Sequence, residues 1–545
     1  MSIPPYSCHT FLFPFLWNDG GKTKRKDFER VLSVGKRWID TSWKCAHVPT
    51  GISQADWLQN YAAYQYFTEP ANAAIFNTHG DNTIVSCLEY RHRGAPLKDD
   101  AKYIITKDAE SFPLEINAIR MHLYDSGVAI LILELENRQS ESLGAVNKIN
   151  EYGRRINMPF LAPGGFHPLC ADRIEILFGD TVFETEDYRA TLDKLGEDFQ
   201  AKTAEISLSY IMKPIQKLID NDGSDNGGAE VTTKAEEAKE SSRKYLIRPC
   251  VDDRMFVCCL IRDDNTFRAA TVWDASAEDY AYLSNCAKDD HAVSDILYST
   301  VYIENKISCV SRRMKKELLT ASVYDRWIDY GTLYATTHHS LFCITGEDRD
   351  GKIGLEAAVY NPFLNEYVQL AILALAQRAT ILALLGEASA VAEGLKDNSQ
   401  ITPDQIDDIE RLQAKYVKAQ NQLFLAEATV QEQGVEIYNR IREHLYIGVN
   451  KTELDAQMTN LRDVANISND RLERRSDERL NKNLSWLTLI SLGVGIVADI
   501  PVFFDPDTPN WSKVLAAVIA VMSIAIGCCL LKSTLFKGKK EDRRK

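Results

Sequence analysis

Two long apolar stretches near the C-terminus constrain the fold of this chain more than any other feature. They run from Trp486 to Phe504 and from Val514 to Leu531, and a turn-rich segment with two prolines, residues 505–513, separates them. At about 1.5 Å per residue in a helix, each stretch reaches roughly 27 to 29 Å, close to the hydrocarbon thickness of a bilayer. The sequence therefore predicts a two-helix transmembrane hairpin over residues 485–535.

The charges around this hairpin predict its orientation, because Lys and Arg near membrane helices stay on the cytoplasmic side. The connecting loop holds Asp505 and Asp507 against a single Lys513. Both outer flanks are basic, through Arg471, Arg474, Arg475, Arg479 and Lys482 before the first span, and Lys537, Lys539, Lys540, Arg543, Arg544 and Lys545 after the second. We therefore expect both termini, including a basic tail over residues 536–545, to face the cytoplasm.

Composition indicates that the part before the hairpin is folded and not a simple tail. It is roughly 480 residues long, and the chain is 45% hydrophobic and 9% aromatic, which suits two or three packed domains. A net charge of −14 argues against a nucleic-acid polymer as partner, although a local basic pocket for a small phosphate ligand is compatible with it. The twelve cysteines have no C-x-x-C spacing, so we expect reduced, packed thiols.

Residues 1–219 mix strand and helix patterns and are predicted to form an α/β cytosolic domain. The apolar run from Phe11 to Trp17 is typical of a strand. Alternation from Ile119, the turn Asp125-Ser126-Gly127 and an apolar run to Leu135 predict a β-hairpin. Helical spacing follows at Val146, Ile149, Gly153 and Ile156.

The next part of the chain is divided by composition. Residues 220–243 are small and polar, so we interpret them as a linker or a solvated insertion. Residues 244–354 contain strand-like runs at 255–261, 269–273 and 341–345. They are predicted to form either a second α/β section or a continuation of the first sheet.

Residues 355–484 are predicted to be a helical region and stalk. The apolar run from Tyr367 to Leu385 is interpreted as a buried soluble helix because Gln377 and Arg378 lie at its middle. Thr402-Pro403-Asp404-Gln405 is typical of a helix start, and that helix is expected to run to about Tyr446. From Leu454 to Phe504 a continuous helix would extend roughly 75 Å, and it is expected to carry a coiled-coil seam at Leu454, Met458, Leu461, Ala465, Ser468 and Leu472.

A polar stripe runs along the first apolar stretch. If the stretch is helical, spacings of three and four place six residues on one face: Asn481, Ser485, Thr488, Ser491, Gly495 and Asp499. They could line a pore, because an ionisable residue such as Asp499 inside a span usually faces a cavity or a partner. Alternatively, small and hydroxyl residues let helices pack closely. Two helices cannot enclose an aqueous path, so the pore interpretation requires a homo-oligomer.

The densest cytosolic candidate is Asn150-Glu-Tyr-Gly-Arg-Arg-Ile156. Arg154 and Arg155 are adjacent and can offer forked donors to an anionic ligand, while Gly153 leaves space beside them. Alternatively, they are a solvated or salt-bridged pair at a helix C-terminus. His338 and His339 would point to opposite faces of a strand and are interpreted as structural. Pro163-Gly164-Gly165 is interpreted as a loop, and no catalytic or metal-binding motif is evident, so we expect no enzyme, metal site or cofactor.

The order of these parts resembles the CorA superfamily of divalent-metal channels, chiefly over residues 355–545. Those channels carry a Gly-Met-Asn signature at the end of the first span, where this chain has Ala498-Asp499-Ile500-Pro501-Val502-Phe503-Phe504. The large soluble part with Asn150-Glu-Tyr-Gly-Arg-Arg-Ile156 is more similar to the CorA-like membrane effectors associated with type III CRISPR systems.

That second resemblance implies a protein of the bacterial inner membrane that acts in antiviral defence. It implies activation by a nucleotide messenger, the conjugate of S-adenosylmethionine and AMP, and opening of a pore or disruption of the membrane. Asn150, Arg154 and Arg155 would then be the ligand-binding residues. The alternatives are a CorA-type metal channel without the usual filter, and a membrane-tethered scaffold in which the hairpin is only an anchor.

Overall fold

The computed structural model divides the chain into two compact units, which we describe separately. The first contains Met1–Gly394 and Glu410–Thr459, and the second contains Leu395–Ile409 and Asn460–Lys545. The residues described are 5–17, 24–41, 61–97, 100–156, 170–188, 190, 211–219, 247–252, 254–270, 273–274, 279–280, 291–304, 309–346, 355–395, 401–504, 509–511, 513–515, 517–518, 521–522 and 525. The predicted linker at 220–243, the loop at Pro163 and the basic tail lie outside them.

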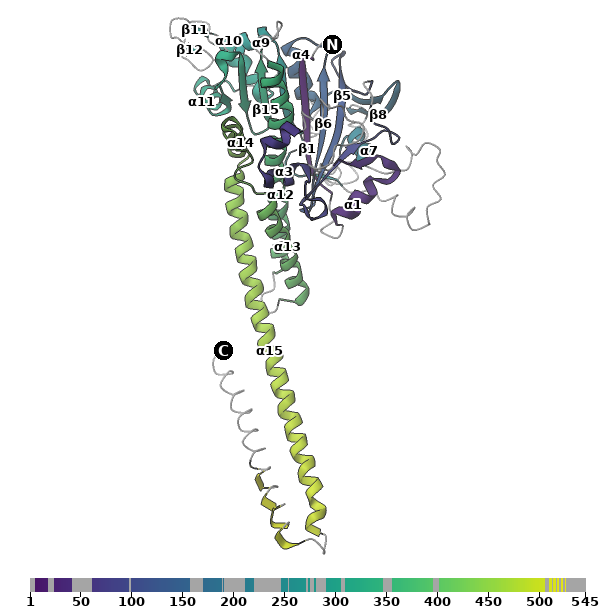
Figure 1. Ribbon diagram of the computed structural model, residues 1–545, viewed down its shortest axis with the longest axis vertical. Helices are drawn as coiled ribbons and strands as arrows, with labels where there is room; N and C mark the ends of the chain where they lie inside the picture. Colours follow the sequence, from purple (N-terminus) through teal and green to yellow (C-terminus); the bar gives the residue numbers. More distant parts are fainter. Residues whose placement is uncertain are drawn as a thin grey trace. The chain divides into compact units, whose positions relative to one another are not determined.

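The first unit is built on a 13-stranded mixed sheet (Figure 1). Its strand order is β13 (Val323–Tyr324), β14 (Thr332–Thr336), β15 (Ser340–Thr345), β10 (Phe256–Arg262), β1 (Ser7–Leu16), β6 (Val128–Asn137), β5 (Glu110–Tyr124), β4 (Lys102–Lys107), β7 (Arg173–Phe178) and β8 (Thr181–Asp187). Three short strands branch from this path, namely β2 (Trp38–Asp40), β3 (Val85–Tyr90) and β9 (Arg248–Pro249). β10 and β15 are parallel, and the other described pairs in this sheet are antiparallel.

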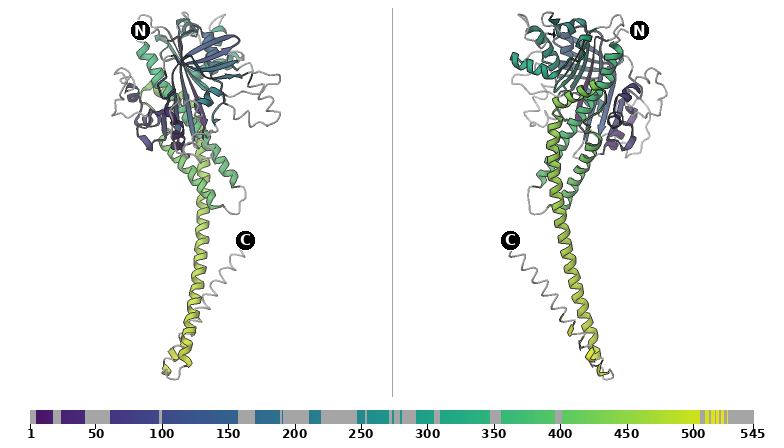
Figure 2. Two further views of the ribbon diagram at one scale, coloured as in Figure 1. Left: turned by 90° about the vertical axis from the view of Figure 1, so that its right-hand side faces the viewer. Right: turned by 60° about the vertical axis from the view of Figure 1, so that its left-hand side comes forward.

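Both faces of the central strands are buried, which explains why their sequences are almost continuously apolar. Phe11, Phe13 and Phe15 of β1 point into one core, and Leu12 between them is also fully buried. Five helices contribute buried side chains to the core that contains these three phenylalanines: α1 (Arg25–Leu32), α4 (Leu143–Gly153), α7 (Lys213–Ile219), α10 (His291–Tyr302) and α11 (Arg312–Ser322). The long helix α12 (Val368–Gly394) packs on β1 and β6, and α3 (Glu69–Phe76) packs against both α12 and β3 (Figure 2).

The structure confirms several strand predictions. The run at Phe11 belongs to β1, and the predicted hairpin is β5 and β6. Residues 244–354 continue the first sheet, because β10 pairs with β1 along Ser7 to Leu12. The predicted strand at 269–273 is wrong: α9 (Asp264–Ala270) covers its start, and Trp273 lies in the two-residue strand β11, paired with β12 (Asp279–Tyr280).

The apolar run at Tyr367–Leu385 is a buried helix of the first unit, as the sequence predicts. Gln377 is fully buried, and its Nε2 donates hydrogen bonds to the main-chain oxygens of Leu423 and Leu425. Among the described residues, one helix is long and apolar enough to cross a membrane, Ala358–Gly394, and 78% of its apolar window is buried inside the protein. Two π-helical turns, Glu356–Tyr360 and Phe363–Tyr367, precede α12.

The helix expected from Thr402 to Tyr446 is two helices. Its start is confirmed, since Gln405 N donates to Thr402 Oγ1 and Thr402 N donates to Gln405 Oε1. The chain then forms α13 (Pro403–Gln422) and α14 (Glu432–His444). The break contains no Pro or Gly before Gly434, and Gln377 binds the two carbonyl oxygens that the interrupted helix exposes. Tertiary hydrogen bonds therefore override local propensity here.

The predicted stalk is one continuous helix, α15 (Ile447–Phe504), of 58 residues. Its expected seam is buried from Leu454 to Ser468 and half-buried at Leu472, so the seam weakens along the helix as predicted. The first apolar stretch is thus helical to Phe504. The second predicted span lies largely outside the described residues, with short helical pieces from Asn510 onward.

Candidate anion-binding site

Helix α4 delivers Arg154 to the interior of the first unit. Ser142 caps the helix by accepting a hydrogen bond from Ala145 N, and Val146 and Ile149 are fully buried on its inner face. Gly153 allows the close approach that this packing needs, because a Cβ there would lie 2.6 Å from Ile105 Cδ1. The helix ends at Gly153, and Met255 N donates to the Arg154 carbonyl oxygen at 2.7 Å, so the residue is fixed to the chain entering β10.

The Arg154 side chain is buried with an incomplete set of partners. The residue is 2% exposed, and its Nη2 reaches the main-chain oxygen of Ile303 at 3.5 Å. Its Nε and Nη1 have no hydrogen-bond partner among the described residues. Buried donors without acceptors are unfavourable, so an anion placed at Nε and Nη1 would stabilise this guanidinium group. Arg154 is buried and forms no ion pair with the described residues, so the alternative prediction of a solvated or salt-bridged residue at the helix end does not hold for it.

Other cations raise the local positive potential. Arg155 is 5% exposed, and its main chain forms an isolated β-bridge with Arg254. Burial, together with repulsion from Arg254 and Arg155, lowers the pKa of Arg154 to about 9. An anion placed here would offset this repulsion and accept forked hydrogen bonds.

Acidic and aromatic residues lie around Arg154, Arg155 and Arg254. Arg254 donates to the Asp252 carboxylate, with Nη2 2.9 Å from Oδ2. Glu304 lies next to Ile303 in the chain, and burial raises the pKa of its carboxyl group, while a hydrogen bond from Tyr298 and the charge of Arg154 oppose that rise. A third carboxylate, that of Glu151, also acts on Arg154, yet the net effect of the surroundings still lowers the pKa of this arginine.

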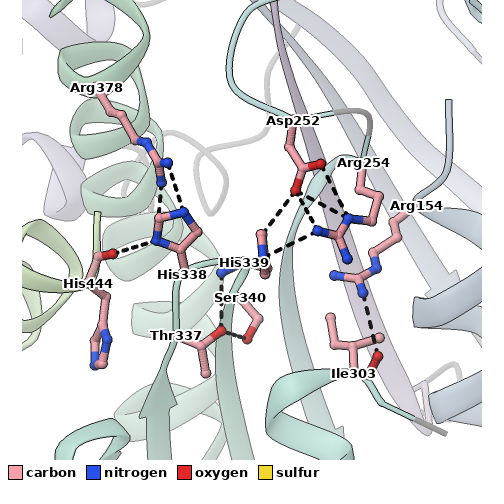
Figure 3. A network of polar contacts seen from close by, with 10 residues as sticks. All are labelled: Arg154, Asp252, Arg254, Ile303, Thr337, His338, His339, Ser340, Arg378 and His444. Atoms are coloured by element: carbon pink, nitrogen blue, oxygen red, sulfur yellow. Dashed lines mark hydrogen bonds and ion pairs between the residues drawn. The ribbon is translucent and has the colours of Figure 1, made fainter. Parts of the chain in front are cut away.

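His339 completes the site on the side of β15 (Figure 3). Its Nδ1 lies 3.2 Å from Asp252 Oδ2, and its Nε2 lies 3.4 Å from Arg254 Nη2. A neutral imidazole with the proton on Nδ1 satisfies both contacts, donating to the carboxylate and accepting from the guanidinium. Burial and the neighbouring Arg254 lower the pKa of His339 to about 3, which favours this neutral form.

Asn150, the third predicted ligand residue, lies one turn earlier on α4 and is fully buried. Its Oδ1 accepts a hydrogen bond from His9 Nδ1 at 2.7 Å, and His9 Nε2 in turn accepts from Ser7 Oγ at 2.9 Å. This chain of hydrogen bonds ties α4 to β1, and burial lowers the pKa of His9 to about 4. Asn150 therefore positions the helix that carries Arg154.

The predicted pore-lining residues all lie on α15 at the expected spacing. Asn481, Thr488 and Ser491 are exposed and Ser485 is half-buried, while the side chains of Gly495 and Asp499 lie outside the described part. Ser485 Oγ and Thr488 Oγ1 donate to the main-chain oxygens four residues earlier. The described residues contain no cluster suited to a metal ion.

Sequence reasoning did not identify Asp252 and Arg254, and it interpreted His339 as structural and not as part of this site. Each lies just before a strand, β10 or β15, whose parallel pairing brings the three together. The short spacing of Asp252 and Arg254 is the one local signal, and the sequence alone does not reveal the parallel pairing. Comparison with protein-family models, curated proteins and solved structures finds no match for this chain.

Proposed function

We propose that this protein is a ligand-gated membrane effector. In this proposal the first unit binds a small anionic nucleotide, α15 carries the resulting change along its length, and the apolar hairpin at residues 485–535 opens or distorts a bilayer as a homo-oligomer. Both termini would lie in the cytoplasm of a bacterium, and the protein would act in antiviral defence of the type III CRISPR kind.

The observation that carries this proposal is the buried guanidinium of Arg154. Its Nε and Nη1 find no partner among the described residues, and Arg155 and Arg254 lie close enough to lower its pKa. A phosphate group would supply the missing acceptors, because guanidinium groups bind phosphate oxygens through paired donors. The resemblance to CorA-like effectors suggests which phosphate compound to try first, the conjugate of S-adenosylmethionine and AMP.

The second part of the proposal rests on α15. The helix begins at Ile447 inside the first unit and continues without interruption through the first apolar stretch. Four apolar side chains near the start of the first apolar stretch are exposed, namely Leu480, Leu484, Trp486 and Leu487. Exposed apolar side chains of this kind are compatible with lipid or with another subunit.

A ligand can open the protein only through different affinities for the closed and open states. A two-hundredfold preference for the open state supplies about 3 kcal/mol, which suffices to shift an equilibrium that lies moderately toward the closed form. Binding and leakage should therefore be measured on the same full-length protein.

The test is dye release from phosphatidylethanolamine and phosphatidylglycerol liposomes that contain the full-length protein. We expect the conjugate of S-adenosylmethionine and AMP to cause release, and Arg154→Ala/Arg155→Ala to abolish it together with binding in calorimetry. Arg138→Ala is the matched control, because Arg138 is ion-paired with Glu115 and Glu136 on the sheet. Magnesium uptake without nucleotide would instead favour a CorA-type channel, and absence of release under every nucleotide would reject gating.

A further inference from the structure

The turn between β14 and β15 lies between the arginine site and Tyr446, the residue before the stalk helix α15. Thr337, His338 and His339 form this turn, with Thr337 N donating to Ser340 O at 2.8 Å. Ser340 Oγ donates to Val301 O at 2.7 Å, and Val257 N donates to His339 O at 3.0 Å. These hydrogen bonds hold the turn against β10 and α10, and both histidines lie on this one short backbone segment.

The two imidazoles have different partners, as Figure 3 shows. His339 contacts Asp252 and Arg254 in the arginine site. His338 contacts Arg378 of α12 and the main chain at the end of α14, with Arg378 Nη2 2.8 Å from Nε2 and His444 O 2.8 Å from Nδ1. The sequence-based placement of these histidines within a strand is wrong, because they lie in the turn before β15, with their ring centroids 4.9 Å apart.

One tautomer of His338 satisfies both short contacts. With the proton on Nδ1, the ring donates to His444 O and accepts from Arg378 at Nε2. His444 is the last residue of α14, so its carbonyl oxygen is one of the groups that a helix end leaves without an intrahelical donor. His338 thus stabilises the C-terminus of α14.

The same ring borders the residue from which α15 begins. The rings of His338 and Tyr446 lie 5.6 Å apart between centroids, and Tyr446 has a φ of 53°. This left-handed backbone is unfavourable for a residue other than glycine, so surrounding contacts must stabilise it. Asn450 N donates to Tyr446 O at 3.0 Å, which makes Tyr446 the acceptor for the first turn of α15.

We propose that the His338–His339 turn is the coupling element between the arginine site and the start of α15. This inference rests on the proposed function. Asp252 is shared by Arg254 and His339, so an anion that binds the arginines competes with Asp252 and changes the contact with His339. His338 moves with the turn, and its contacts with His444 and Tyr446 change in response.

The test is a double-mutant cycle read by amide hydrogen exchange of the full-length protein in detergent, without ligand. We expect Asp252→Asn to speed exchange of the amides at 445–450 at least threefold, and His338→Phe to speed it similarly. The double variant should exchange no faster than His338→Phe alone, because the signal from Asp252 passes through His338. Additive effects, or no effect of Asp252→Asn at these amides, would overturn the coupling.

Two further variants keep the test decisive. Glu387→Gln breaks an ion pair of the same helix α12 with Lys415 and should leave exchange at 445–450 unchanged. If His338→Phe does not fold, Arg378→Lys takes the place of His338→Phe in the cycle. This variant removes the forked donor to His338 but keeps the positive charge. Because no nucleotide is present, failure of this cycle is distinct from failure of ligand-induced dye release.

Discussion

Arg25 Nε lies 2.7 Å from Asp125 Oδ1, so this buried guanidinium group has the counterion that Arg154 lacks among the described residues. Arg25 also donates to Ser86 Oγ and to Thr83 O. The two residues are 5% and 2% exposed, so they differ mainly in their partners. Under the proposed function, Arg25 serves the stability of the fold and Arg154 serves binding.

We therefore expect opposite effects from the same substitution at these positions. Arg154→Met removes an uncompensated buried charge and should raise the free energy of unfolding of the ligand-free protein by about 1 to 3 kcal/mol. Arg25→Met should lower it by about 2 kcal/mol or more, since Asp125 would keep only Lys418. Urea unfolding midpoints of the full-length protein in detergent measure both. A destabilised Arg154→Met would contradict the assignment of a binding role.

Gly153 and Gly144 offer a matched pair on α4. A Cβ at Gly153 would lie 2.6 Å from Ile105 Cδ1 and 3.1 Å from Phe11 Cε2, whereas a Cβ at Gly144 would meet no atom within 4 Å. Gly153→Ala should therefore cost about 1 to 3 kcal/mol of stability through overpacking and should displace Arg154. Gly144→Ala should be neutral or stabilising by up to about 1 kcal/mol. Thermal midpoints of the two variants give the comparison, and equal shifts would exclude the packing explanation.

Buried neutral histidines predict loss of stability in mild acid. Burial lowers the pKa of His9 to about 4, below the ordinary value of about 6.5 that the unfolded chain would have. Between these values the unfolded state binds the additional proton, so stability falls as the pH drops from 6.5 toward 4, on the order of 1 kcal/mol per pH unit for this residue. His122 behaves alike, because burial lowers its pKa to about 4.

The check on this prediction is the change in urea midpoint between pH 7 and pH 5. His9→Gln should reduce that change, while His79→Gln, at a position 56% exposed, should leave it as in the unmodified protein. An unchanged pH response in His9→Gln would show that folding does not lower the pKa of His9.

Asp499 tests the role of the first apolar stretch. The residue lies on the stripe that begins at Asn481, and an ionisable group within a span usually faces a cavity or a partner. Under the pore interpretation, Asp499→Leu should reduce nucleotide-dependent dye release about tenfold with binding unchanged. Full release from this variant would favour the alternative in which small residues only pack helices.

Sequence patterns correctly predicted the elements whose structure depends on residues close together in the chain. The alternation before Asp125, the capping pair Thr402 and Gln405, and the seam from Leu454 all have the predicted structure. Each depends on residues a few positions apart, so a single sequence contains the required information.

The failures arise where distant residues decide the outcome. The helix at 402–446 is interrupted because Gln377, far away in the chain, binds the carbonyl oxygens of Leu423 and Leu425. Arg154 and Arg155 were found as a pair, but the burial of Arg154 follows from the packing of α4 on β1 and β4. Asp252 and His339 join them only through the parallel pairing of β10 and β15.

The central place of β1 has a consequence for biosynthesis. This phenylalanine-rich strand is synthesised before both of its neighbours, β6 and β10, which are encoded at 128–137 and 256–262. At ordinary elongation rates β10 follows β1 by roughly 12 to 50 s. During that interval the apolar strand β1 is exposed in the nascent chain without the strands that pair with it. We therefore expect holdase chaperones to bind it before the sheet forms.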